Sequence, residues 1–273
     1  MSINRLERRR NLTRLSDELK SHAEQLRVSV EPSPAAKKLS SELFLSHSTR
    51  ERHFAEICDA QCISSKANLA LKSREPLPTC SDEVILDTSN YVFLFAAPFR
   101  YPNTGCGFLF TRTLEVEHNE SGVATPFDSG GLLHHMTRPN PSESVNAFLA
   151  RHEMPIPEHR EYLGLVMTTL FDDPKAYLEG MSPSHPNPIG LTGGDYRQWT
   201  HEVRIPEKVY IQGSAHLKAV FAPRSRVADP SVEALLTWCQ LEKIDFILFD
   251  TPKSDDFQGL QQTCLSYTRR ALY

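Results

Sequence analysis

The chain has 273 residues, and 30 basic against 34 acidic side chains give it a formal net charge of −4. Apolar residues make up 40% and charged residues 23%, a balance that excludes global disorder and disfavours a general polyanion-binding protein, while leaving room for a local basic groove. The N-terminus lacks the apolar stretch of a secretory leader, and no apolar run is long enough to span a bilayer. We therefore expect a cytoplasmic protein with free thiols and no membrane association.

The N-terminal segment is predicted to form a helix over residues 3–27. Its apolar residues recur at three- and four-residue steps and make one stripe: Leu12, Leu15, Leu19, Ala23 and Leu26. Its first half is basic: Arg5, Arg8, Arg9, Arg10 and Arg14. We interpret residues 1–30 as an amphipathic basic helix packed on the body of the protein, with a dimer contact or a nucleic-acid-binding arm as alternatives. Pro32 and Pro34 then predict a linker.

After the linker, the sequence predicts strands at 42–47, 84–86, 91–97 and 107–117 and a helix at 50–61. The run 91–97 is the most apolar, and Pro98 ends it. A loop rich in glycine, proline and serine follows over residues 118–141.

The rest of the chain mixes helices and strands. Helices are predicted at 143–152, 160–180, 231–242 and 257–271, and strands at 201–205, 208–211, 217–221 and 245–249. A long loop with three prolines and a Gly-Gly pair covers residues 182–195. Because strands and helices do not alternate regularly, a doubly wound parallel sheet is excluded, and an α+β fold with antiparallel strands at its centre is predicted.

Two short motifs do not support the chemistry that their spacing first suggests. Cys58 and Cys62, with His53 nearby, could share a helix face as zinc ligands do, but the second ligand pair of a metal site is missing, so no metal is expected. The run Gly105-Cys106-Gly107 begins like a dinucleotide-binding fingerprint. It lacks the third glycine, and a strand follows where the fingerprint needs a helix.

The run Asp128-Ser129-Gly130-Gly131 invites comparison with a serine hydrolase, since His134 and His135 follow closely. The nucleophile motif needs a glycine two positions before the serine, and Phe127 stands there. We interpret the run as a turn, with a ligand-contacting loop as the alternative.

Three segments far apart in the sequence each place a polar group at a strand end: residues 43–49, 91–100 and 199–206. In this order they resemble the elements of the ADP-ribosyltransferase fold, and the aromatic strand followed by Pro98 and Arg100 is similar to that of DarT-type DNA ADP-ribosyltransferases. The resemblance implies an α+β catalytic domain over residues 42–222, with a split antiparallel β core flanked by helices. Residues 225–273 would add a helix–strand–helix extension packed on it.

The resemblance also implies NAD as co-substrate and a role for each polar group. Breaking the nicotinamide–ribose bond passes through an oxocarbenium-like state, and the catalytic carboxylate of Glu202 would stabilise its positive charge. The second catalytic residue, Arg100, would hold the pyrophosphate or orient the acceptor. The residues expected to bind NAD are His47 (through a ribose hydroxyl), Ser48, Thr49, Tyr91 and Tyr101. Phe95, inside the strand, is interpreted as core.

The chain departs from the family pattern at two positions. Tyr101 follows Arg100, where the DarT-type pattern has arginine and serine together. Thr200 stands two positions before Glu202, where arginine-modifying relatives carry glutamate or glutamine. The second departure disfavours arginine as the modified group and leaves a nucleic acid or another acceptor.

The loop before Glu202 is expected to select the acceptor. Tyr196 and Arg197 suit the stacking and clamping of an unpaired base, whereas Trp199 is expected to be buried as the strand begins. The resulting hypothesis is an NAD-dependent ADP-ribosyltransferase acting on DNA or RNA, a toxin or antiviral defence effector with a neutralising antitoxin or regulatory partner. Alternatives are an NAD glycohydrolase or an RNA 2′-phosphotransferase on the same fold, and a non-enzymatic α+β binding module.

Overall fold

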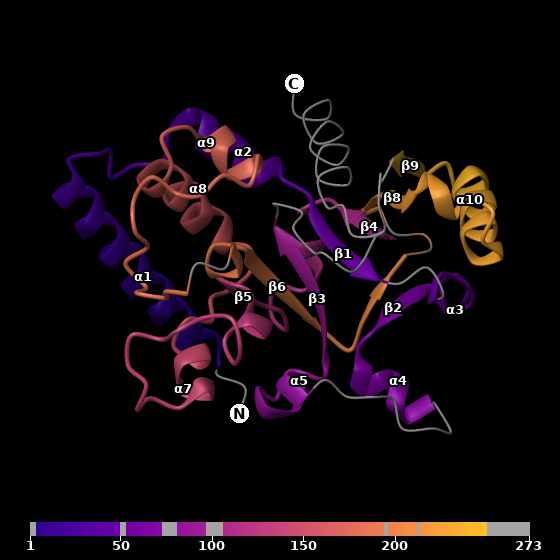
Figure 1. Ribbon diagram of the computed structural model, residues 1–273, viewed down its shortest axis with the longest axis horizontal. Coiled ribbons are helices and arrows are strands. Elements are labelled where there is room, and N and C mark those ends of the chain that lie inside the picture. The colour runs from indigo at the N-terminus through magenta and orange to yellow at the C-terminus, as the bar shows by residue number, and fades with distance from the viewer. Residues whose placement is uncertain are drawn as a thin grey trace.

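The computed structural model describes residues 4–49, 53–72, 81–96, 106–193, 196–211, 213 and 215–249, without the side chains of residues 70–72, 81 and 196. Its centre is a seven-stranded sheet in the order β5-β6-β3-β1-β4-β8-β9 (Figure 1). These strands are β1 Leu45–Thr49, β3 Tyr91–Ala96, β4 Cys106–Phe110, β5 Val123–Thr125, β6 His201–Pro206, β8 Leu217–Pro223 and β9 Asp245–Phe249. Neighbouring strands are antiparallel except β8 and β9. The predicted α+β fold with an antiparallel core flanked by helices is confirmed.

The sheet splits between β1 and β3. β1 pairs with β4 over all five of its residues but with β3 only at Leu45 and Ser46. Beyond Ser46 the two strands diverge, toward the bottom of the view in Figure 1. There a side-chain hydrogen bond replaces the backbone hydrogen bonds between β1 and β3: His47 Nδ1 donates to the Phe93 carbonyl oxygen at 2.9 Å. The split therefore opens space beside His47 without leaving this carbonyl unpaired.

Helix α8 (His159–Leu170) is the centre of the helical layer on the left of Figure 1. The helices packed against it are α1 (Arg5–Leu26), α2 (Pro34–Glu42) and α9 (Pro174–Leu178). The first agrees closely with the predicted helix over 3–27. The second was not predicted and begins where the predicted linker ends: Ser33 accepts a hydrogen bond from the Ala36 amide, and a proline in the first turn of a helix loses no hydrogen bond.

Helix α1 packs on the body of the protein, as the first interpretation predicts. The side chain of Arg8 is buried and its Nη1 donates to the Gly122 carbonyl oxygen at 3.1 Å. Arg9 pairs with Glu158 at 3.2 Å, closer to the surface. Much of the basic half of α1 is thus used within the fold, which weakens the alternative of a free nucleic-acid-binding arm.

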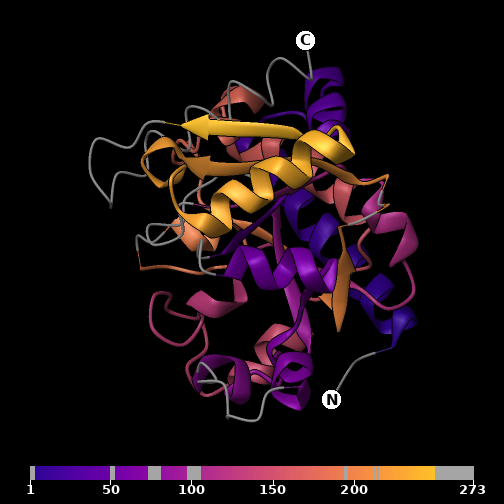
Figure 2. The same ribbon diagram turned by 90° about the vertical axis from the view of Figure 1, so that its right-hand side faces the viewer.

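The last described segment, residues 230–249, forms a helix and the edge strand at the end of the sheet opposite β5. Helix α10 (Pro230–Glu242) packs against α3 (Phe54–Ala60), and the two are seen face-on in Figure 2. Strand β9 then adds a parallel edge strand beside β8. Its bounds agree with the predicted strand 245–249, whereas the predicted helix 257–271 lies outside the described residues.

Several predicted elements are wrong in type or extent. Residues 84–86 are not a strand, because Val84 and Ile85 belong to helix α5 (Ser81–Ile85). The predicted strand 107–117 ends at Phe110 and continues as helix α6 (Leu114–Glu117). The predicted helix 160–180 is interrupted after α8, since Asp173 caps a new helix, α9, that begins with Pro174.

Short elements were missed because they carry little periodicity. They are helices α4 (Lys66–Lys72) and η2 (Ser129–Gly131), strand β5, and strand β2 (Cys62–Ser64), which pairs with β7 (Lys208–Tyr210) in a second sheet. Helix α7 (Val145–Ala150) lies within the predicted 143–152, and η3 (Tyr196–Gln198) and η4 (Arg224–Arg226) are single turns. Among the helices of the described part of the chain, none combines the length and apolar character needed to cross a bilayer.

Candidate active site

The carboxyl group of Glu202 lies on β6 with no solvent exposure. The turn η2 supplies two hydrogen bonds to it: the Ser129 hydroxyl donates to Oε1 at 2.7 Å and the Ser129 amide donates to Oε2 at 3.1 Å. On the same strand, Nε of Arg204 lies 3.3 Å from Oε1. Residues two apart on a strand face the same side, so β6 itself brings this pair together. The carboxyl is therefore fixed in orientation from two directions.

Burial raises the pKa of Glu202 to about 8, and the nearby Asp128 carboxylate adds to the increase. The positive charge of Arg204 and the hydrogen bonds from Ser129 act in the opposite direction. A carboxyl that titrates near neutral pH can exist in either charge state under physiological conditions. Such groups are concentrated at catalytic sites, although buried ion networks also produce them.

Arg204 is held as firmly as Glu202. Its Nη2 donates a hydrogen bond of 2.7 Å to Glu153 Oε1, and its guanidinium lies 5.5 Å from the centre of the Tyr91 ring. Tyr91, one of the residues expected to bind NAD, therefore already has a cation on its ring.

A cleft of about 290 Å³ opens onto Glu202. Its walls are Phe93 and Phe95 from β3, turn η2 with Asp128 and Ser129, Arg197 from η3, and Asp82 and Glu83 from α5. Nε of Arg197 lies 3.9 Å from Asp128 Oδ2, so this half-buried cation stands beside the acidic groups of the cleft. The ionisable groups of the described lining are mainly acidic, which suits a ligand that carries or develops positive charge.

A second cleft of about 340 Å³ lies beside the first, where β1 and β3 diverge. It is lined by His47, Ser48, Thr49 and Tyr91, and it shares Glu83, Phe93 and Phe95 with the cleft at Glu202. Phe95, interpreted from the sequence as core, is 9% exposed and belongs to the wall between the two clefts. The two spaces can therefore hold two parts of one elongated ligand.

The hydrogen bond from His47 fixes its tautomer. A carbonyl oxygen can only accept, so Nδ1 carries the proton and Nε2 of the neutral ring is an acceptor. Burial lowers the pKa of His47, which keeps the ring neutral at pH 7. Gly107, from the rejected dinucleotide motif, lies directly behind it: a Cβ there would be 2.0 Å from the His47 carbonyl oxygen. That glycine is explained by close strand packing.

The structure brings Glu202, Arg197, His47, Ser48, Thr49 and Tyr91 around these two clefts. Arg100 and Tyr101 lie outside the described residues, as does the side chain of Tyr196, whose backbone is in η3. Trp199 is half-buried, so the expectation that it is buried holds only in part.

Sequence reasoning missed four residues of the site: Asp128, Ser129, Glu153 and Arg204. The signal for Ser129 was present, since a ligand-contacting loop was the alternative interpretation of its glycine-containing run. The signal for Arg204 was its spacing of two from Glu202 on a predicted strand. Glu153 carries no local signal, because its partners are distant in sequence.

Among the residues that the structure describes, no group of three or more histidine, cysteine or acidic side chains is arranged to hold a metal ion. His53 has its Nδ1 3.3 Å from Glu56 on the surface, Cys58 is half-buried on α3, and Cys62 begins β2. Nothing in this arrangement links the three residues as ligands.

The chain matches no family model and no curated protein. Among solved structures it is similar to DarT from Thermus sp. 2.9 in complex with ADP-ribosylated ssDNA, at 9% identity and a TM-score of 0.45, over 76% of this chain and 93% of that chain. The same protein in complex with NAD⁺ gives 10% identity and a TM-score of 0.42, over 76% and 94%. DarTG from Thermosipho africanus in complex with ADP-ribose gives 10% and 0.41, over 75% and 49%.

The resemblance to DarT-type proteins that the sequence suggested thus recurs in the comparison of structures. Identities near 10% and TM-scores below 0.5 are too low to transfer residue roles.

Proposed function

We propose that this protein is an ADP-ribosyltransferase that uses NAD⁺ as co-substrate and a nucleic acid as acceptor. The observation that supports this most directly is the pair of adjoining clefts. One contains a buried carboxyl group, Glu202, and the other contains hydroxyls and a neutral histidine, and both share the wall of Phe93 and Phe95. NAD⁺ has a cationic nicotinamide riboside at one end and an adenosine, with its own ribose hydroxyls, at the other, which matches this division.

The chemistry follows from the position of Glu202. The bond from ribose C1′ to the nicotinamide nitrogen breaks, the electron pair leaves with neutral nicotinamide, and the ribose carries the positive charge. The ionised Glu202 stabilises that charge, and the acceptor then attacks C1′ and releases its proton to water. Because burial raises the pKa of Glu202 to about 8, arrival of a cationic nicotinamide favours the ionised form and releases a proton.

The other proposed roles follow the two clefts. His47 Nε2 accepts a hydrogen bond from a ribose hydroxyl, and the hydroxyls of Ser48 and Thr49 are available beside it. Arg100, by its place directly after the aromatic strand, is proposed to clamp the pyrophosphate or the acceptor, with Tyr101 next to it.

The acceptor is proposed to approach over η3. Arg197 lines the cleft at Glu202, and Tyr196 precedes it in the same turn. An arginine and a tyrosine together suit an unpaired base, which favours single-stranded nucleic acid. An enzyme of this kind acting on cellular nucleic acid in the cytoplasm would be toxic, so we include a neutralising protein and a role as a toxin or defence effector in the proposal.

The test uses the whole chain and NAD⁺ labelled in its adenylate half, offered with single-stranded DNA, RNA or a protein lysate. We expect label on nucleic acid together with released nicotinamide, both lost in Glu202→Gln and retained in Glu242→Gln, which changes an exposed glutamate of α10. Free ADP-ribose without labelled acceptor would indicate an NAD glycohydrolase. Label on protein alone would overturn the nucleic-acid acceptor, and unaltered NAD⁺ would overturn the enzyme.

A further inference from the structure

A row of alternating charges, of which Glu153 is half-buried and the others are buried, connects the N-terminal helix with Glu202. Nε of Arg8 lies 3.9 Å from Glu153 Oε2, Arg204 Nη2 donates to Glu153 Oε1 at 2.7 Å, and Arg204 Nε lies 3.3 Å from Glu202 Oε1. The exposed fractions are 4% for Arg8, 1% for Arg204 and 0% for Glu202. Charges interact much more strongly in such surroundings than in water, so a change at one end of the row affects the other.

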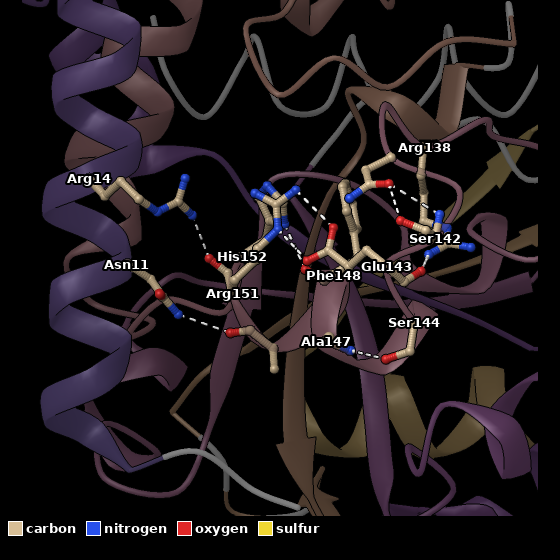
Figure 3. Close-up of polar contacts among 12 residues, drawn as sticks. Asn11, Arg14, Arg138, Ser142, Glu143, Ser144, Ala147, Phe148, Arg151 and His152 are labelled. Carbon is tan, nitrogen blue, oxygen red and sulfur yellow. Dashed lines mark hydrogen bonds and ion pairs between the residues drawn. The ribbon is translucent and has the colours of Figure 1, made fainter.

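The backbone of residue 153 is also held by α1. Asn11 Nδ2 donates to the Glu153 carbonyl oxygen at 3.0 Å, and Arg14 Nη2 donates to the Arg151 carbonyl oxygen at 2.6 Å. Figure 3 shows Asn11 and Arg14 reaching from α1 toward the turn that follows α7. The helix therefore contacts Glu153 twice, at its backbone through Asn11 and at its carboxylate through Arg8.

We propose that Arg8 and Glu153 are positioning residues for the active-site carboxyl: through them, α1 fixes the orientation of Arg204 and thereby the geometry and the charge of Glu202. This proposal rests on the proposed function, and it assigns the N-terminal helix a role in the active site. Arg204 stands between two carboxylates, and the share of its positive charge that Glu202 experiences depends on Glu153.

Other groups also face Glu202 and must be kept constant. They are Asp128 and Ser129 from the η2 turn, Arg197 from η3, and Asp82 and Glu83 from α5, while Tyr91 from β3 packs on Arg204. Substitutions at Arg8 and Glu153 change none of these residues. A change in the titration of Glu202 in such variants is therefore transmitted through Arg204 or directly along the charge row.

The two positions are expected to act with opposite sign. Glu153→Gln removes the carboxylate that competes for Arg204, so the pKa of Glu202 should fall by about one unit, the low end of the effect of a nearby opposite charge. Arg8→Gln leaves Glu153 free to neutralise Arg204 more completely, so the pKa of Glu202 should rise by about half a unit. A residue needed only for folding would not produce shifts of opposite direction.

The chain offers a matched control pair on the same helix. Arg9 is the neighbour of Arg8, its side chain is 55% exposed, and it pairs with Glu158 at 3.2 Å. Arg9→Gln and Glu158→Gln make the same charge changes near the surface, where solvent and salt screen them. Both should leave the titration of Glu202 unchanged, and the conservative changes Arg8→Lys and Glu153→Asp should stay close to wild type.

The measurement is the pH dependence of the Glu202 carboxyl band in infrared spectra, isolated by subtracting the spectrum of the same protein carrying Glu202→Gln. It needs no turnover, so a wild type that does not consume NAD⁺ would overturn the proposed function and leave this test intact. Where turnover is present, the pH profile of kcat/KM should move with the band. No shift in a folded Glu153→Gln or Arg8→Gln variant, shifts of the same sign, or equal shifts in the Arg9 and Glu158 controls would overturn the proposal.

Discussion

The two clefts on either side of Phe93 and Phe95 are built in different ways. At Glu202 the polar groups are buried and each has fixed partners: Ser129 and Arg204 for Glu202, and Glu153 for Arg204. At His47 the strands diverge, the side chains are half-buried, and one hydrogen bond, from His47 to Phe93, fixes the ring. The first arrangement is typical of preorganised chemistry, and the second is typical of binding that depends on the ligand.

The largest expected effect is at the preorganised side. Glu202→Gln keeps the size of the side chain and a hydrogen bond from Ser129 but removes the charge, so we expect turnover of NAD⁺ to fall by roughly two to three orders of magnitude. Binding of NAD⁺ should change little, because the other cleft is intact. Released nicotinamide measures turnover and calorimetric titration measures binding. Near-native turnover would contradict the catalytic role of Glu202.

The next effect separates acceptor from co-substrate. Changing Tyr196 and Arg197 to alanine together should reduce transfer to single-stranded nucleic acid by roughly tenfold to a hundredfold, since stacking contributes about 1–3 kcal/mol per base. Hydrolysis of NAD⁺ should fall much less than transfer, because His47 and Glu202 remain, although Arg197 also faces Glu202. The matched control changes an exposed tyrosine and an exposed arginine elsewhere, Tyr210 and Arg224. Equal loss in both double variants would show that the effect is not specific to η3.

A smaller effect is expected at the divergent strands. His47→Ala removes one neutral hydrogen bond, so KM for NAD⁺ should rise by about twofold to tenfold while kcat changes less. His47→Gln places an amide oxygen near the position of Nε2 and should restore part of the affinity. If kcat falls and KM does not change, His47 contributes to the chemical step and the division between the two clefts is wrong.

How much the sequence could predict differs between these regions. Strand β6 and a strand ending at His47 were predicted from local apolar patterning, whereas Glu202 and His47 were chosen through the resemblance to the ADP-ribosyltransferase fold; in the structure His47 is the middle residue of β1. The contacts that fix the orientation of Glu202 were not predicted, because they join residues that are distant in sequence. Ser129 is 73 residues from Glu202, and Glu153 is distant in sequence from its partner Arg204. Helix α2 was missed for a different reason: Pro34 was interpreted only as a helix breaker, whereas proline fits the first turn of a helix.

A last comparison concerns two adjacent residues that face opposite sides of β6. His201 shares a hydrogen bond of 2.7 Å with His159, and burial lowers the pKa of His201 to about 3. Burial raises the pKa of Glu202 to about 8. Below the ordinary histidine pKa of about 6.5, the unfolded chain binds a proton that folded His201 does not, so its contribution to stability is lost as pH falls. Glu202 binds a proton in the folded state that the unfolded chain releases above about pH 4.3, so its contribution to stability is lost as pH rises toward 8.

The melting temperature of wild type minus that of His201→Gln should therefore decrease from pH 7 to pH 4. The melting temperature of wild type minus that of Glu202→Gln should decrease from pH 5 to pH 8. If the melting-temperature difference between wild type and Glu202→Gln stays constant with pH, Arg204 keeps Glu202 ionised over this range. The carboxyl would then act as a fixed charge instead of a group that titrates when NAD⁺ binds.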